Sequence, residues 1–159
     1  MRGVYFVLVI LAALLLFFGC GDKGNPAVGG NDDLSAINWV GTDKVYSDSA
    51  DKKQCSFIFF YADWCGWCKK MEKETFSDTA VVRIINESFN AVRINGESDT
   101  LVVYRDSALS CRGMVEYYGI TGYPTTCFFK GAGQYIIPVL GYKSAQVFRQ
   151  ILDTILTAK

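Results

Sequence analysis

The chain has 159 residues, half of them hydrophobic, and its 16 basic residues balance its 16 acidic residues, so the formal net charge at pH 7 is zero. This balance gives no electrostatic attraction to nucleic acid. The sequence contains no His, which excludes the commonest general base and the commonest metal ligand and leaves cysteine as the reactive side chain.

The N-terminus has the features of a secretory signal. Arg2 precedes an apolar run of 15 residues, 4–18, which is short for a helix that spans a bilayer. Gly19 and Cys20 end the run. A small residue before a lone Cys resembles a bacterial lipoprotein signal, which implies a signal peptide over 1–19, cleavage before Cys20 and a lipid on that cysteine. The two Phe residues before Gly19 depart from this pattern, so a plain cleaved signal and an uncleaved anchor remain alternatives. All three place the protein outside the cytoplasm, where disulfides persist.

Residues 20–35 are rich in Gly and Asp, which is typical of a flexible tether. Residues 36–159 are enough for one α/β domain with its own core. Apolar periodicity, caps and turns predict the elements in chain order. The first half is expected to contain a short strand over 37–40, a weak helix over 44–53, a fully buried strand over 57–61, a helix over 65–75 and a helix over 78–86 capped by Ser77. The second half is expected to contain a strand over 89–95, an extra strand or apolar lid over 101–104, a helix over 114–118, a hairpin of 126–130 and 135–140 with Pro138 at a sheet edge, and an amphipathic helix over 144–157.

A Cys-x-x-Cys motif, formed by Cys65 and Cys68, lies where the buried strand gives way to a helix. The positive end of the helix dipole favours the Cys65 thiolate and brings its pKa from about 8.5 toward 7, so we expect Cys65 to be the nucleophile. Cys68 lies one turn further and is expected to stay a thiol until it resolves a mixed disulfide. A structural disulfide and half of a zinc site are the alternatives, although no second Cys-x-x-Cys supplies the other two thiolates.

Two segments make the chain recognisable. Residues 61–69, with their continuation 71–78, resemble the active-site segment of the thioredoxin superfamily, and most closely the C-terminal domain of the thiol:disulfide interchange protein DsbD and related periplasmic thioredoxin-like lipoproteins. Residues 118–125 resemble the cis-proline loop of the same family. The resemblance covers residues 36 to 157. It implies a thioredoxin-like fold, a central mixed sheet with helices on both faces, and a cis Pro124 opposite the cysteine pair.

The resemblance also implies roles for residues near the motif. Tyr123, beside the proline, is expected on the substrate-facing surface. Trp64 is expected to pack beneath the motif, whereas Trp67 is expected to be exposed as a contact for partners. With Gly66, Trp67 leaves no cation between the cysteines, which favours a moderately reducing protein.

One position departs from the family. Phe59 stands where relatives carry a buried Asp that assists proton transfer from the second cysteine. The nearest substitute is Glu72, four residues after Cys68 and therefore on the same helix face. We expect Glu72 to accept the Cys68 proton. The alternative is that it belongs to the solvated face formed by the neighbouring lysines.

Three further cysteines have no role in the motif. Cys127 lies among aromatic residues and is expected to be an inert core thiol. Cys55 and Cys111 are expected to be free thiols, with a bridge between them as the alternative. Such a bridge would pin residues 96–110, a segment longer than a minimal thioredoxin needs.

Together these features predict a membrane-tethered thiol:disulfide oxidoreductase of the bacterial cell envelope, acting on its periplasmic or extracytoplasmic face. Its partners are a disulfide-bearing client protein and a membrane protein that donates electrons. It needs no cofactor or metal beyond the Cys65–Cys68 pair. The alternatives are a disulfide oxidase or isomerase at the same site, and a non-catalytic binding module that recruits a partner through Trp67 and Tyr123.

Overall fold

The computed structural model describes residues 36–46 and 53–158 of the chain. The predicted signal peptide over 1–19, Cys20 and the tether over 20–35 lie outside these residues and stay predictions. Among the described helices, none combines the length and apolar character needed to cross a membrane.

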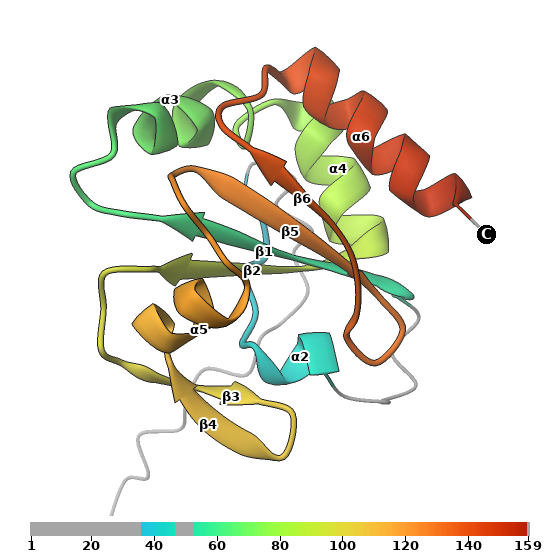
Figure 1. Cartoon of the computed structure of the whole chain (residues 1–159). Helices are drawn as coiled ribbons and strands as arrows, with labels where there is room; N and C mark the ends of the chain where they lie inside the picture. Colours follow the sequence, from blue (N-terminus) through green and yellow to red (C-terminus); the bar gives the residue numbers. More distant parts are fainter. Residues whose placement is uncertain (1–35, 47–52, 159) are drawn as a thin grey trace, which may run out of the picture. The chain divides into compact units, whose positions relative to one another are not determined.

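A four-stranded mixed sheet lies at the centre of the domain, with the strand order β2-β1-β5-β6 (Figure 1). β1 runs parallel to β2 and antiparallel to β5, and β5 forms an antiparallel hairpin with β6. The strands are β1 (Cys55–Tyr61), β2 (Phe89–Asn95), β5 (Thr125–Lys130) and β6 (Gln134–Leu140). The predicted α/β fold is confirmed.

Helices cover both faces of this sheet, and each face has its own core. On one face lie α3 (Gly66–Glu74), α4 (Thr79–Ser88) and α6 (Ala145–Thr157), and on the other lie α2 (Asp43–Tyr46) and α5 (Cys111–Tyr117) (Figure 1). The first core contains residues of α3, α4 and α6, whereas the second contains Val45 of α2 and Met114 of α5.

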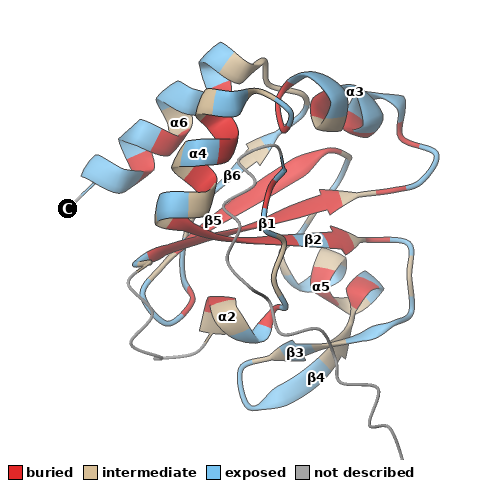
Figure 2. Cartoon of the chain, turned by 180° about the vertical axis from the view of Figure 1, so that it is seen from behind, coloured by how far each residue is buried: buried red, intermediate tan, exposed pale blue. Residues whose placement is uncertain are grey.

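β1 separates the two cores, because successive side chains of a strand point to opposite faces. Phe57 and Phe59 belong to the first core, and Ile58 and Phe60 to the second; all four are fully buried. β6, by contrast, has only one neighbouring strand and is mostly exposed (Figure 2). Pro138 therefore lies on an edge strand, as predicted, where the missing N–H disturbs the sheet least.

The 96–110 segment forms a small sheet of its own. β3 (Leu101–Tyr104) pairs with β4 (Ser107–Ser110) in an antiparallel hairpin that is separate from the main sheet (Figure 1). The hairpin is held to α5 by the N–H of Cys111, which donates to Thr100 O over 2.9 Å. The prediction of an extra strand is confirmed.

Several predicted boundaries were wrong. Asp78, not Ser77, caps α4, and its carboxylate accepts hydrogen bonds from the N–H groups of Ala80 and Val81 at 3.0 Å. Ser77 instead donates to the carbonyl of Lys73 at the end of the preceding helix. Ser and Asp both cap helices, so the sequence alone does not show which of two adjacent residues is the N-cap.

Three other segments also differ from expectation. The helix predicted over 114–118 begins at Cys111, because Ser110 caps it. Residues 37–40 contribute one parallel bridge, between Trp39 and Ala91, rather than a strand. Of the weak helix predicted over 44–53, the described part is α2, and residues 47–52 lie outside the described residues.

Candidate active site

The turn from β1 into α3 presents two sulfurs at the start of a helix. The N–H of Cys65 donates to Ala62 O over 3.0 Å, which closes the turn after the strand. Cys65 then occupies the N-cap of α3 with an extended backbone, and its Sγ accepts a hydrogen bond from the N–H of Cys68 over 3.1 Å. A sulfur in this position receives a donor from the first turn of the helix, which favours its ionised form.

Cys65 and Cys68 form a disulfide, with their Cα atoms 5.3 Å apart. Both residues are buried, with 3% and 1% of their surfaces exposed. Their different roles therefore follow from their positions in the helix and not from burial. Within the described part of the chain, no group of three or more Cys, Asp or Glu side chains is placed to hold a metal ion.

The predicted cis-proline loop lies beside the pair. The Tyr123–Pro124 peptide bond is cis, and the carbonyl of Pro124 accepts a hydrogen bond from the N–H of Gly141 over 2.8 Å. The N–H and C=O of Tyr123 have no backbone partner among the described residues. A pocket of about 330 Å³ opens here, lined by Trp67, Tyr123, Pro124, Gly141 and Tyr142. An extended peptide segment fits such a surface, because free main-chain groups can pair with it.

The two tryptophans of the motif are both exposed. The prediction for Trp67 is confirmed: 59% of its surface is exposed, and its ring lies 5.8 Å from that of Tyr142. The prediction that Trp64 packs beneath the motif was wrong, because 72% of its surface is exposed and it meets Tyr123 edge-on at 6.0 Å.

Other aromatic rings pack in the core that also contains Cys65 and Cys68. Phe76 lies 4.9 Å from Phe59 and 5.6 Å from Trp39, ring centre to ring centre. Trp39 reaches this position from the start of the domain, a contact that no local pattern indicates.

Glu72 is only partly exposed, with 35% of its side-chain surface accessible to solvent. Its Oε1 is shielded from solvent and lies 3.0 Å from Nη2 of Arg93 on β2, although the N–H is not aligned for a hydrogen bond. The guanidinium of Arg93 also lies 4.6 Å from the ring centre of Tyr61. Sequence reasoning missed Arg93; the signal was a charged residue within an otherwise buried strand. The role of Glu72 as proton acceptor for Cys68 stays a prediction.

The other three described cysteines are buried free thiols, as expected. A bridge between Cys55 and Cys111 is contradicted, because the two belong to cores on opposite faces of the sheet. Cys127 is fully buried, and burial raises the pKa of its thiol to about 11. Its Sγ lies 3.9 Å from the hydroxyl of Tyr135. An uncharged thiol of this kind is inert toward disulfides.

Two supporting residues were not predicted. Tyr142 closes the pocket beside Trp67, and its hydroxyl donates to Glu74 over 2.7 Å. Lys70 lies over both rings, 5.2 Å from the centre of Trp67 and 5.0 Å from that of Tyr142. These contacts join α3 to the loop after β6, across sequence separations of 68 residues or more, and fix the orientation of Trp67.

Comparisons with known proteins agree with this geometry. Residues 43–156 match the family model of the thioredoxin-like domain. The thiol:disulfide interchange protein DsbD of Pseudoalteromonas atlantica is 32% identical over 94 residues, which cover 57% of this chain and 14% of that protein. Protein disulfide-isomerase A5 of Bos taurus is 28% identical over 105 residues, covering 65% of this chain and 18% of that protein. The chain therefore spans less than a fifth of either relative.

A solved structure supports the same fold. A thioredoxin from Thermus thermophilus superposes with a TM-score of 0.61, at 16% identity, covering 77% of this chain and 88% of that one.

Proposed function

The chain belongs to the thioredoxin-like domain family, and on this premise we propose that it is a membrane-tethered, extracytoplasmic thiol:disulfide oxidoreductase that reduces disulfides in client proteins. The observation that carries the proposal is the hydrogen bond from the Cys68 N–H to Cys65 Sγ. In the reduced protein the same donor stabilises a Cys65 thiolate, which is the attacking form of the side chain.

The exchange proceeds in two steps. The Cys65 thiolate attacks one sulfur of the client disulfide, a Cys65–client disulfide forms, and the other client sulfur leaves as a thiolate that takes up a proton. Cys68 then loses its proton and attacks Cys65 Sγ, which releases the second client thiol and closes the Cys65–Cys68 disulfide. Two electrons pass to the client, and a dithiol on a membrane protein restores the pair by the reverse exchange.

The surface beside the pair suits an extended client. The unpaired main chain of Tyr123 offers an N–H and a C=O to the segment that carries the client cysteine, while Trp67 and Tyr142 provide apolar walls. The direction of electron flow is proposed from the motif: Gly66 and Trp67 place no cation between the cysteines, so the reduced form is not stabilised as it is in a strong oxidant.

Tethering and location rest on the N-terminal sequence. The lipoprotein-like signal places a lipid on Cys20, and residues 20–35 would connect it to the domain. The similarity to a thiol:disulfide interchange protein supports an envelope location and a membrane protein as electron donor.

Trapping of the client tests the proposal. The Cys68→Ser variant is expected to accumulate a mixed disulfide on Cys65, visible as a thiol-sensitive shift in mass, because the resolving thiol is absent. Cys65→Ser is the matched control, since it keeps Cys68 but lacks the nucleophile. Equal trapping by both variants would contradict the proposal, as would an intact phenotype after replacement of both cysteines, which the binding-module alternative predicts.

The reduction potential separates a reductase from an oxidase or isomerase. We expect the Cys65–Cys68 pair, equilibrated with glutathione, to have a potential below that of glutathione. A potential at or above that of glutathione would favour the oxidase or isomerase instead.

A further inference from the structure

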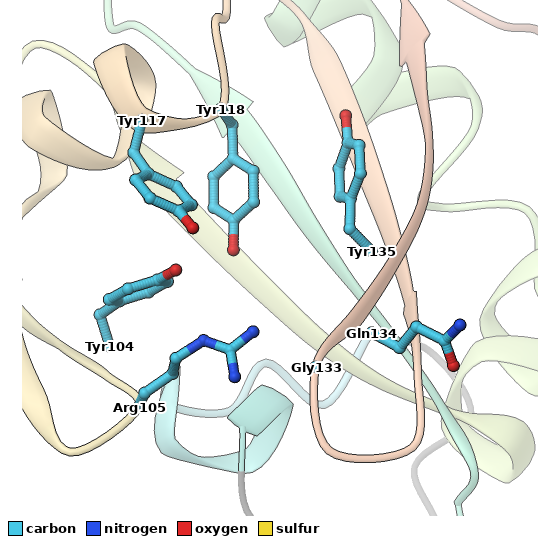
Figure 3. A pocket seen from close by; sticks show the side chains of 7 residues that line it. All are labelled: Tyr104, Arg105, Tyr117, Tyr118, Gly133, Gln134 and Tyr135. Atoms are coloured by element: carbon cyan, nitrogen blue, oxygen red, sulfur yellow. The ribbon is translucent and has the colours of Figure 1, made fainter.

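A second pocket, of about 490 Å³, lies away from the cysteine pair on the face of the sheet that carries α5 (Figure 3). Its walls come from the β3–β4 hairpin, the end of α5 and the turn between β5 and β6. The lining residues are Tyr104, Arg105, Tyr117, Tyr118, Gly133, Gln134 and Tyr135. None of them lines the pocket at Pro124, and the volume is in the range of small-molecule sites.

Hydrogen-bond donors converge on this space. Figure 3 shows the hydroxyls of Tyr104, Tyr117 and Tyr118 pointing toward one another, with the guanidinium of Arg105 beside them. No carboxylate is among the lining residues. The pocket therefore has a net positive charge and mostly donors, an arrangement that suits an anion.

Tyr117 and Tyr118 remain protonated at neutral pH. Burial raises the pKa of Tyr118 to about 12, and hydrogen bonding to Tyr104 raises the pKa of Tyr117. The hydroxyls of Tyr118 and Tyr46 lie 2.9 Å apart and share one hydrogen bond, which uses one of their two protons. When Tyr46 donates, the proton of Tyr118 is available to a ligand.

Arg105 is held in an unusual backbone conformation. It is the first of two residues in the β3–β4 turn, because Tyr104 pairs with Ser107, and it has a φ of 51°. A positive φ at this position favours Gly. Among the described residues Arg105 makes no ion pair, and its guanidinium lies 5.8 Å from the ring centre of Tyr104. The Arg105 side chain is exposed, and no carboxylate that lines the pocket matches its charge.

The opposite wall is aromatic. The rings of Tyr118 and Tyr135 are nearly parallel, at 26°, with centres 5.5 Å apart. Gly133, in the β5–β6 turn, has a φ of 78°, and a Cβ there would lie 2.5 Å from Cδ1 of Tyr46. Only glycine lets the turn approach so closely, so the wall depends on this residue.

We propose that this pocket binds a small aromatic carboxylate. The carboxylate accepts hydrogen bonds from Arg105 and the hydroxyl of Tyr118, and the ring packs against the aromatic wall that includes Tyr135. One guanidinium matches a monoanion, and the tyrosine rings match an aromatic body. This gives the β3–β4 hairpin a role that the redox chemistry does not require.

Titration with benzoate, followed by NMR of the ¹⁵N-labelled protein, tests the proposal. Saturable shifts are expected at residues 104–106, 117–118 and 133–135, and benzamide, a neutral molecule of the same shape, should bind at least tenfold more weakly. Arg105→Gln should lose the preference for benzoate, and Arg105→Lys should retain it in part. Arg149→Gln, which removes an exposed arginine on α6, is the control and should bind as the original chain does.

Three results would overturn the proposal: no saturable shifts, equal binding of benzoate and benzamide, or unchanged binding by a folded Arg105→Gln protein. Shifts confined to Trp67 and Tyr123 would also overturn it, because the ligand would then occupy the other pocket. Disulfide reduction by the Arg105 variants should equal that of the original chain, so this test is separate from that of the redox function.

Discussion

The main-chain N–H of Cys68 points at the sulfur of Cys65 over 3.1 Å. The first turn of α3 places this N–H donor at Cys65 Sγ, where negative charge develops when the disulfide opens. The contact depends only on local helix geometry, so it persists as long as Cys65 is the N-cap of α3.

In the reduced protein, Cys65 is expected to react with iodoacetamide at pH 7 about tenfold faster than cysteine in an unfolded peptide, because the helix N-terminus raises its thiolate fraction. Mass spectrometry of the modified cysteines measures the rate at each site. Cys127 serves as the internal control and should react only on unfolding, since it is fully buried. Equal rates for Cys65 and the peptide would contradict the proposed nucleophile.

Glu72→Gln is expected to slow release of the client from the mixed disulfide by at least tenfold, because Cys68 then lacks a nearby proton acceptor. The remaining rate should rise with pH, as Cys68 deprotonates to solvent. Stopped-flow tryptophan fluorescence across pH 6 to 9 measures this step. Glu87→Gln is the control, because Glu87 is an exposed carboxylate on α4 that does not line the client pocket. An equal effect of both variants would assign Glu72 to the solvated surface.

Gly96→Ala is expected to destabilise the domain by about 1–3 kcal/mol. A Cβ at this position would lie 2.2 Å from the hydroxyl of Tyr123 and 2.6 Å from Cγ2 of Val115. The displaced Tyr123 should also reduce the rate of disulfide exchange, as it lines the client pocket. In Gly122→Ala the new Cβ meets open space, so this control should change stability by less than about 0.5 kcal/mol. Urea denaturation measures both variants, and equal losses would exclude the steric explanation.

Cys127 is expected to contribute to alkaline unfolding. Its folded pKa, about 11, lies above the ordinary value of 9.0, so the unfolded chain ionises first as pH rises. Stability is therefore complete below pH 9 and falls by about 2 kcal/mol by pH 11. In Cys127→Ala the slope of unfolding free energy against pH over this window should be smaller. Cys55→Ala is the comparison, and an unchanged slope in Cys127→Ala would refute the assignment.

Local patterns were enough for the elements that form the redox centre. A continuous apolar run predicts β1, since such a run is typical of a strand buried on both faces. The cysteine spacing predicts the start of α3, where neighbours along the chain make the decisive contacts. The loop at Pro124 was implied by the resemblance of residues 118–125 to the family's cis-proline loop.

Contacts between elements far apart in the sequence were beyond such reasoning. Arg93 on β2 reaches Glu72 on α3, and Trp39 packs against Phe76. Periodicity shows that a residue is buried, but not which distant residue shares its pocket. The Cys55–Cys111 alternative failed for the same reason, since sequence does not tell one face of a sheet from the other.

The sequence by itself determined the chemistry of this protein: two sulfurs at a helix start and a proline loop to face them. The tertiary structure alone decided the surroundings, which are the exposure of Trp64, the partner of Glu72 and the tyrosine pocket around Arg105. The physical reason is the sequence separation between the residues that interact. Helix caps and strand patterns are set within a few residues, whereas packing joins residues that only the completed fold brings together.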